Sequence, residues 1–312
     1  NSLETLLNAG NYRDRIRFIT VPRIKDVQRR ADFKKEKWKV STPETTIDCS
    51  ATAYFFAKQI TETLNLPVGL VINSWGGSRI ESWMTEETLS SIQGIDIETA
   101  KSSKLDVRNR LGCLYDIMLW PVKNYTARGF LWYQGESNIF NYQFYAPMMT
   151  AMVQLWRNVW EAPDMPFYYV QIAPYKYENS RNTGAALLRE AQVEALKTIP
   201  NSGIVPTTDI GDEFCIHPPQ KDVVGLRLAT LALTKTYGIR RLPSNGPMMT
   251  KVDYADKKAI VTFDNAPAGL FPTFSELEGF EIAGADKKFY PAKAKIVGRT
   301  NTVEVWSEEV AQ

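Results

Sequence analysis

The chain contains one histidine, His217, in the stretch "DEFCIHPPQK". Imidazole has a pKa near neutrality and is the common general base for a hydroxyl nucleophile, so His217 is a candidate catalytic residue. Such a base also needs a group that orients its ring, and Asp209, Asp212 and Glu213 are the nearby carboxylates. The alternative is that His217 is an ordinary surface or core residue.

A second polar stretch, "NSWGGSRIESW", contains the pair Gly76 and Gly77. Glycines let the backbone approach a ligand and expose N–H groups, which suits an oxyanion hole. Ser74 could be a nucleophile, but the nucleophile-elbow pattern requires glycine two residues earlier, where Ile72 stands. A tight turn with a serine cap is the other interpretation of this stretch.

A third polar stretch, "WYQGESN", offers the side-chain amide of Gln134 as a neutral donor to a developing oxyanion. Ser137 has glycine two residues before it but Ile139 two residues after it, so it also fails the elbow pattern. Trp132 and Tyr133 are expected in the core more often than on a sugar-binding surface.

These residues follow apolar runs typical of strands that are covered on both faces. The expected strands are "IRFITV", "VGLVIN", "GFLWYQ", "FYYVQI" and "GIVPTT", at 16–21, 68–73, 129–134, 167–172 and 203–208. Helical patterns lie between them, at 50–65, 146–160, 185–199 and 220–238. Alternating strands and helices predict a parallel sheet between helix layers.

Ligands of an open parallel sheet bind beyond the carboxyl ends of its strands. Polar clusters follow four of the expected strands there, namely "NSWGGSRIESW", "QGESN", "APYKYENSRN" and "DIGDEFCIHPPQK". Strand packing does not require these residues, so they predict a functional site at that edge. After about residue 240 the pattern changes to short alternating segments, which predict a small β module over 243–312.

Composition excludes several functions. With 37 basic and 35 acidic residues and a net charge of +2, the chain lacks the basic surface that nucleic acids require. No apolar run approaches the roughly 18 residues that cross a bilayer, so we expect no membrane partner. Cys49, Cys113 and Cys215 lie far apart with no CxxC spacing, which argues against a zinc site.

The stretches "PVGLVINSWGGSRIESWM", "GFLWYQGESN" and "DIGDEFCIHPPQKDVVGLRLA" resemble the sialate O-acetylesterase family of SGNH hydrolases. The resemblance implies an α/β fold: a three-layer α/β/α, flavodoxin-like parallel sheet over 1–240, followed by a small β-rich accessory module over 243–312. Whether that module is truncated is left open.

The resemblance also implies roles for individual residues. His217 matches the catalytic histidine, Gly76 or Gly77 the oxyanion-hole glycine, and Gln134 the amide donor. Further residues are expected near the substrate or directly behind the site: Trp75, Arg79, Glu136 and Asn138. Arg79 and Arg189 could bind a sialic acid carboxylate, or be ordinary surface or helix-packing arginines.

Two features depart from the family pattern. Many SGNH enzymes have an aspartate three residues before the histidine, where this chain has Phe214, so either Asp212 or a backbone carbonyl orients the ring and a triad and a dyad both stay open. The nucleophilic serine of a "GQSN" motif is absent. We expect that serine, with the central first strand of the sheet, in a segment preceding Asn1 or in a second chain. Without that strand, each unsatisfied backbone group in the core costs roughly 1–3 kcal/mol.

The sequence therefore predicts a carbohydrate O-acetylesterase that removes acetyl groups from sialic acid by acyl transfer to serine, without a metal or cofactor. Acetylxylan or another acetylated glycan is the alternative substrate. A non-catalytic carbohydrate-binding protein is the alternative of another class. The resemblance alone implies a periplasmic or extracellular location.

Overall fold

The computed structural model describes residues 2–33, 36–177, 183–240, 242, 244–272 and 276–310. The chain divides into two compact units, Asn1–Ser244 and Asn245–Gln312, and each is described by itself. The first unit carries all of the predicted site residues.

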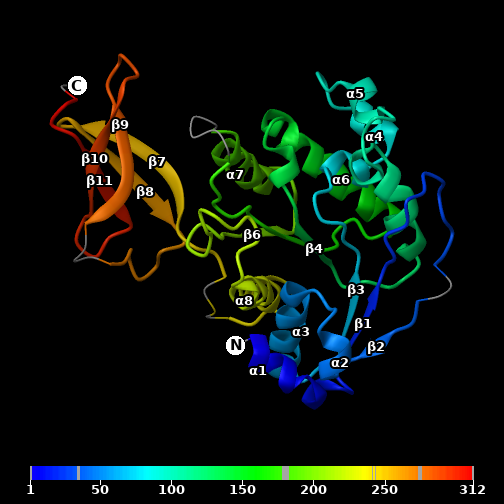
Figure 1. Ribbon diagram of the computed structural model, residues 1–312. Helices are drawn as coiled ribbons and strands as arrows, with labels where there is room; N and C mark the ends of the chain where they lie inside the picture. Colours follow the sequence, from blue (N-terminus) through cyan, green and yellow to red (C-terminus); the bar gives the residue numbers. More distant parts are fainter. Residues whose placement is uncertain are drawn as a thin grey trace. The chain divides into compact units, whose positions relative to one another are not determined.

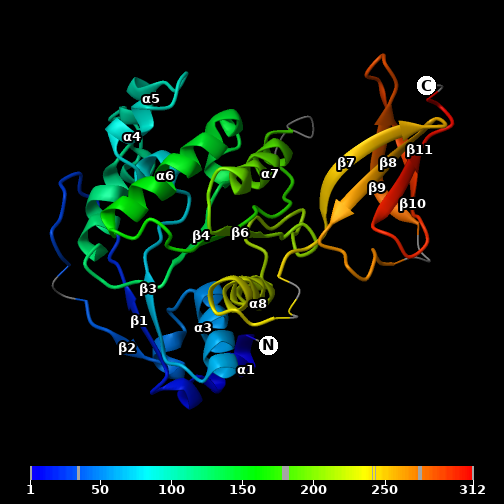
Figure 2. The ribbon, with the colours of Figure 1, turned by 180° about the vertical axis from the view of Figure 1, so that it is seen from behind.

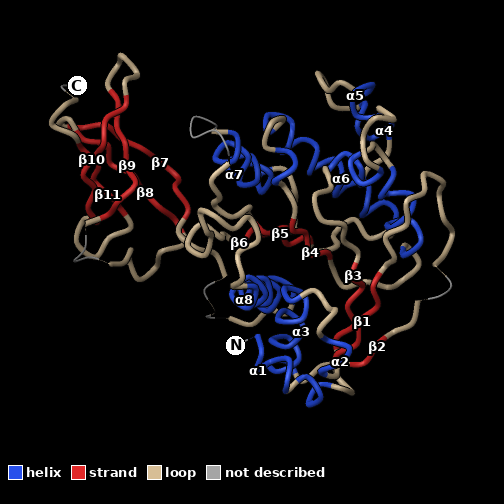
Figure 3. Tube along the Cα trace, viewed as in Figure 1, coloured by secondary structure: helices blue, strands red, loops and turns tan. Residues whose placement is uncertain are grey.

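Two three-stranded sheets form the centre of the first unit (Figure 3). One has the order β2-β1-β3, in which β1 and β3 are parallel and β2 is antiparallel to β1; the other has the order β4-β5-β6 and is parallel throughout. The strands are β1 (Ile16–Thr20), β2 (Lys39–Val40), β3 (Val68–Ile72), β4 (Phe130–Tyr133), β5 (Phe167–Val170) and β6 (Ser202–Val205). The five strands expected from apolar runs are all present, whereas the two-residue β2 was not predicted.

The sequence predicted a parallel sheet whose central first strand lies outside this chain, and the described residues form two separate sheets. β3 and β4 lie next to each other in Figure 1 and Figure 2, but each ends its own sheet and no hydrogen bond joins them within the described chain. Leu131, in the middle of β4, is 36% exposed. A central strand of such a fold normally buries its apolar side chains, so this exposure marks β4 as an uncovered edge.

Helices cover both sides of these strands (Figure 1). On one side α3 (Ala51–Leu64) packs against α8 (Lys221–Leu231), and on the other lie α6 (Tyr145–Val159) and α7 (Gly184–Glu194). The shorter helices are α1 (Ser2–Leu7), α2 (Pro43–Thr46), α4 (Glu86–Ser90) and α5 (Ile97–Lys101). This arrangement confirms the predicted three-layer α/β/α class.

Local sequence explains the helix ends and the close packing. The Ser50 hydroxyl accepts a hydrogen bond from the backbone N–H of Ala53 and caps α3. At the contact of α3 with α8, a Cβ on Gly225 would lie 2.6 Å from the Cβ of Phe55. Glycine is required at this position because a larger residue would push the two helices apart.

The core above the sheet is rich in aromatic and methionine side chains. α6 contributes a buried stripe of Met148, Met149, Met152, Val153 and Trp156. Trp132 packs edge-to-face against Trp156 at 5.4 Å between ring centroids and is 7% exposed. Trp132 is therefore a core residue.

The second unit is a five-stranded antiparallel sheet with the order β7-β8-β11-β10-β9. Its strands are β7 (Met248–Ala255), β8 (Lys258–Asp264), β9 (Leu277–Ala283), β10 (Phe289–Ile296) and β11 (Thr302–Trp306). Alternate residues such as Val303 and Val305 are buried in a core of its own. The expected β-rich module is thus present.

Candidate active site

The loops that follow β3, β4 and β6 converge at the carboxyl ends of the strands. The Gln134 amide, directly after β4, donates a hydrogen bond of 2.8 Å to the carbonyl of Ser78 in the loop after β3. The Glu136 carboxylate interacts electrostatically with His217 in the loop after β6. Three of the four predicted polar clusters therefore come together, and the described part of the fourth joins them through the ion pair of Lys176 with Glu213. In the fourth, "APYKYENSRN", residues 178–182 lie outside the described part of the chain.

The glycine turn, residues 74–78, has its carbonyl groups held by other segments. Arg23 Nε donates to the Ser74 carbonyl at 2.9 Å, and Arg108 Nη1 donates to the Gly76 carbonyl at 3.1 Å. The Ser137 hydroxyl donates to the Gly77 carbonyl at 3.0 Å. With Gln134 on the Ser78 carbonyl, the turn is therefore held by four side chains from outside it.

The N–H groups of this turn are arranged differently. Gly76 and Gly77 are exposed, and among the described residues neither backbone N–H has a hydrogen-bond acceptor. Gly77 has φ +74°, a conformation that strains any residue with a Cβ. Ordered, exposed N–H groups at a sheet edge are what an oxyanion hole requires, so the predicted role of these glycines has a suitable geometry.

Gln134 differs from its prediction as an oxyanion donor. It is buried, and its Nε2 donates at 2.8 Å to both the Ser78 carbonyl and Asn138 Oδ1. Its Oε1 accepts the Tyr145 hydroxyl at 2.8 Å. Because a primary amide has only two protons, this arrangement leaves none for a substrate. In the structure, Gln134 supports the glycine turn by holding the Ser78 carbonyl.

Asn138 also belongs to this buried network and does not face a substrate. Its Oδ1 accepts the backbone N–H of Ile80 at 3.0 Å, and its Nδ2 donates to Glu81 Oε2 at 2.8 Å. Glu81 is 5% exposed, and its other carboxylate oxygen accepts the Asn141 amide at 2.8 Å. The two asparagines thus satisfy a buried carboxylate, which otherwise would be costly to bury.

His217 lies in the exposed loop between β6 and α8. The Cys215 thiol donates to its carbonyl at 3.2 Å, which steadies the loop backbone. Asp212, predicted to orient the ring, instead accepts the N–H groups of Phe214 and Cys215 at 2.7 and 3.0 Å. The structure therefore gives Asp212 a turn-forming role, and among the described residues no hydrogen bond joins its carboxylate to the imidazole.

The other two nearby carboxylates are also engaged elsewhere. Asp209 forms a two-oxygen ion pair with Arg227 at 2.8 and 2.5 Å, and the hydrogen bond from this arginine lowers the pKa of Asp209. Glu213 pairs with Lys176 at 2.9 Å. The Glu136 carboxylate, by contrast, interacts electrostatically with His217.

Glu136 follows β4 at the start of a 3-10 turn, Glu136–Asn138. Burial raises the pKa of its carboxyl, and electrostatic interactions with Lys221 and His217 oppose that rise. Burial likewise lowers the pKa of Lys221, whose ammonium lies 5.0 Å from the centroid of the Tyr133 ring. Groups with shifted pKa values on convergent loops are typical of functional sites.

The remaining predicted residues lie around this cluster. Trp75 is half-buried against the core, and the Arg79 guanidinium stacks over Phe140 at 4.5 Å. Arg189, in α7, is half-buried, and burial lowers its pKa. Ser74 is exposed.

Sequence reasoning missed the residues that act from a distance in the chain. Arg23 and Arg108 touch the site, and nothing in their local sequence distinguishes them from other basic residues. Lys221 was not singled out either, although it ends the predicted cluster "DIGDEFCIHPPQK". Arg23 and Arg108 donate to main-chain carbonyls in the glycine turn, and such contacts leave no side-chain pattern to recognise.

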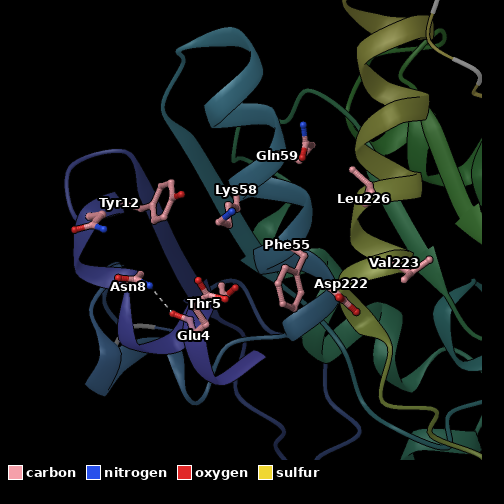
Figure 4. A pocket seen from close by; sticks show the side chains of 11 residues that line it. Glu4, Thr5, Asn8, Tyr12, Phe55, Lys58, Gln59, Asp222, Val223 and Leu226 are labelled. Atoms are coloured by element: carbon pink, nitrogen blue, oxygen red, sulfur yellow. Dashed lines mark hydrogen bonds between the residues drawn. The ribbon is translucent and has the colours of Figure 1, made fainter. Parts of the chain in front are cut away.

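A pocket lies elsewhere in this unit. It has a volume of about 610 Å³ and lies between α1, α3 and α8, where Phe55, Lys58, Gln59 and Leu226 line it (Figure 4). None of the predicted site residues borders this pocket. The candidate active site is therefore identified by the side chains and N–H groups that converge there, and not by a cavity. Within the described ranges, no group of three or more His, Cys, Asp or Glu residues could hold a metal. No helix in those ranges is both long and apolar enough to cross a membrane.

Comparisons with known proteins identify the family of the chain. The profile of the family "Carbohydrate esterase, sialic acid-specific acetylesterase" matches residues 30–234. Sialate O-acetylesterases of mouse and human are 27% and 26% identical to the chain over 65% and 84% of its length. The chain spans 46% and 54% of those two proteins, about half of each.

A solved structure gives the same result. The crystal structure of a carbohydrate acetylesterase from Xanthomonas citri matches 99% of this chain and 68% of its own chain, with a TM-score of 0.87 and 32% identity. The chain belongs to the sialic acid-specific acetylesterase family of carbohydrate esterases.

Proposed function

We propose that this chain forms part of a carbohydrate O-acetylesterase that works by acyl transfer to serine. The observation that carries the proposal is the glycine turn, whose exposed N–H groups lie at the same sheet edge as the single imidazole of the chain. Family membership supports the same activity. The names of the relatives favour acetylated sugars, and O-acetylated sialic acid first among them.

The reaction has two stages. His217 takes the proton of a serine hydroxyl as the serine oxygen bonds to the acetyl carbon, and the carbonyl oxygen becomes an oxyanion held by the Gly76 and Gly77 N–H groups. The bond from the acetyl carbon to the sugar oxygen then breaks, and His217 gives that oxygen its proton. Water repeats the sequence on the acetyl-serine and releases acetate.

The serine and one further strand come, in this proposal, from a segment preceding the chain or from a second chain. Two observations support a parallel strand seated between β3 and β4. Both strands end their sheets without a partner on that side in the described structure. Leu131, in the middle of β4, is exposed as the residue of an uncovered strand would be. A strand there would end beside the glycine turn and His217.

Labelling tests this proposal in the protein isolated from its natural source. A fluorophosphonate should modify one serine, and peptide mass spectrometry should place that serine outside residues 1–312. Labelling of Ser74 would show that the chain supplies its own nucleophile. No labelling and no acetate release would instead favour the non-catalytic, carbohydrate-binding alternative.

The substrate needs a separate experiment. Acetate release from O-acetylated sialic acid should exceed release from acetylxylan at equal ester concentration. The reverse order would move the substrate to plant glycans and leave the mechanism unchanged. A periplasmic or extracellular location rests on family resemblance alone, and cell fractionation with an antibody against the chain tests it.

A further inference from the structure

The two glycines of the turn differ in what orients their N–H groups. A trans peptide unit is planar, so its C=O and N–H groups point in opposite directions. The N–H of Gly76 belongs to the same peptide unit as the Trp75 carbonyl, which accepts the Ser78 N–H at 3.3 Å within the turn. The direction of the Gly76 N–H is therefore set by the turn itself.

The N–H of Gly77 belongs to the same peptide unit as the Gly76 carbonyl, and this carbonyl accepts Arg108 Nη1 at 3.1 Å. No other donor to the Gly76 carbonyl is present in the described part of the chain. The glycines on both sides give this peptide unit more rotational freedom than other residues would allow. Without Arg108, the peptide unit can rotate.

The Arg108 guanidinium is itself held over the turn. Its backbone N–H donates to Asp106 Oδ1 at 3.1 Å, and its Nε lies 3.6 Å from the same oxygen. On the other side, a Cβ on Gly77 would lie 3.5 Å from Arg108 Nη1, so the guanidinium packs directly against this glycine. The side chain is thus positioned by the loop at 106–108 and by the glycine turn together.

From these contacts we infer that Arg108 is a positioning residue of the oxyanion hole, which fixes the direction of the Gly77 N–H by holding the Gly76 carbonyl. The inference rests on the proposed function for its effect on turnover. A charged donor on the carbonyl also polarises the peptide unit, which makes the Gly77 N–H a stronger donor to the oxyanion.

The chain offers a matched control two residues away. Arg110 lies in the same loop and also donates to main-chain carbonyls, but to Ser103 and Leu105 at 3.0 and 3.2 Å, inside its own loop. Arg110→Ala removes a similar side chain and similar hydrogen bonds without touching the glycine turn. It separates a loss of positioning from a general loosening of the loop.

In the complete protein, Arg108→Ala should lower kcat on p-nitrophenyl acetate by about tenfold to a hundredfold, somewhat less than loss of a whole oxyanion donor. KM should change little, because the ground-state ester needs this N–H less than the transition state does. Arg108→Lys should fall between alanine and wild type, and it serves as the test if the alanine variant does not fold. Wild-type kcat in both Arg108 variants, or an equal loss in Arg110→Ala, overturns the inference.

A second measurement does not need turnover. Acetate, the expected product, should shift the amide NMR signals of Gly76 and Gly77 in the wild type. Arg108→Ala should weaken the response of Gly77 by about tenfold, and Arg110→Ala should leave it unchanged. If the wild type hydrolyses no ester, the proposed function fails, and the acetate titration still decides the role of Arg108. Equal Gly77 responses in wild type and Arg108→Ala overturn it.

Discussion

The loop after β4 and the loop after β6 border the same site with opposite degrees of burial. After β4, the side chains of Gln134 and Asn138 are buried, and each makes several hydrogen bonds to other side chains or to the glycine turn. After β6, His217 is exposed, and its loop is held by bonds within itself and by surface ion pairs of Asp209 and Glu213.

The buried loop after β4 therefore supports the site, whereas the exposed loop after β6 carries its reactive group. Replacing a buried amide that makes all of its hydrogen bonds lowers the stability of the fold, and such an amide has no proton left to bind a substrate. Replacing an exposed imidazole on a loop changes the stability of the fold little, and the imidazole can exchange protons with a substrate. Four predictions follow from this comparison and test it, in order of expected effect.

His217→Ala should produce the largest effect on activity and a small effect on stability. We expect the rate on p-nitrophenyl acetate in the complete protein to fall about a thousandfold, because the general base is lost. The free energy of unfolding should change by less than about 0.5 kcal/mol, as for other exposed positions. Retention of more than a tenth of the wild-type rate would remove His217 from the mechanism.

Asn138→Ala should produce the largest effect on stability. The change leaves the buried Glu81 carboxylate with one donor fewer and the Ile80 N–H without its acceptor, at a cost of about 2–4 kcal/mol. Urea denaturation measures this cost. Asn109→Ala is the matched control, because Asn109 also accepts a backbone N–H of this segment, that of Arg79, but without a buried carboxylate. Asn109→Ala should lower the free energy of unfolding by about 1 kcal/mol. If the two variants lose equal stability, the hydrogen bonds of Asn138 to the buried Glu81 carboxylate add nothing.

Glu136 should make stability depend on pH. Burial raises the pKa of its carboxyl in the folded protein, so between the usual carboxyl pKa and this raised value the folded protein binds more protons than the unfolded chain. Its contribution to stability should therefore fall as pH rises through that window. Glu136→Gln should remove this fall in stability. Urea midpoints measured from about pH 4 to 8, the range over which a buried carboxyl titrates, test this. A parallel pH profile in the two proteins would show that Glu136 is solvated.

Asp212→Asn should produce the smallest effect on activity. Loss of the aspartate from a catalytic triad lowers kcat about 10,000-fold, but Asp212 accepts backbone N–H groups of its own loop, and an asparagine oxygen can accept the same bonds. We expect a loss of less than about tenfold, by the ordinary effect of a surface change. A loss a hundred times larger would restore Asp212 as the partner of the imidazole.

The helices and strands were largely predictable because apolar periodicity directly reflects burial. The run at 167–172 became β5, in which all four residues are buried, and the apolar stripe of 146–160 became the buried face of α6. The site was predictable only in part. Glycines beyond a strand indicated a turn with exposed N–H groups, but the amide of Gln134 gave no sign of where its protons would go.

The sequence by itself determined where the strands end, and hence that Gly76, Gly77 and His217 gather at one edge, because local apolar patterns decide burial. Only the tertiary structure decided which polar groups keep a free hydrogen-bond donor or acceptor for a substrate. Arg108 reaches Gly76 across 32 positions of the chain, and Gln134 reaches Ser78 across 56. A hydrogen-bond donor takes the acceptor that folding brings beside it, and this choice depends on packing that a single sequence does not display.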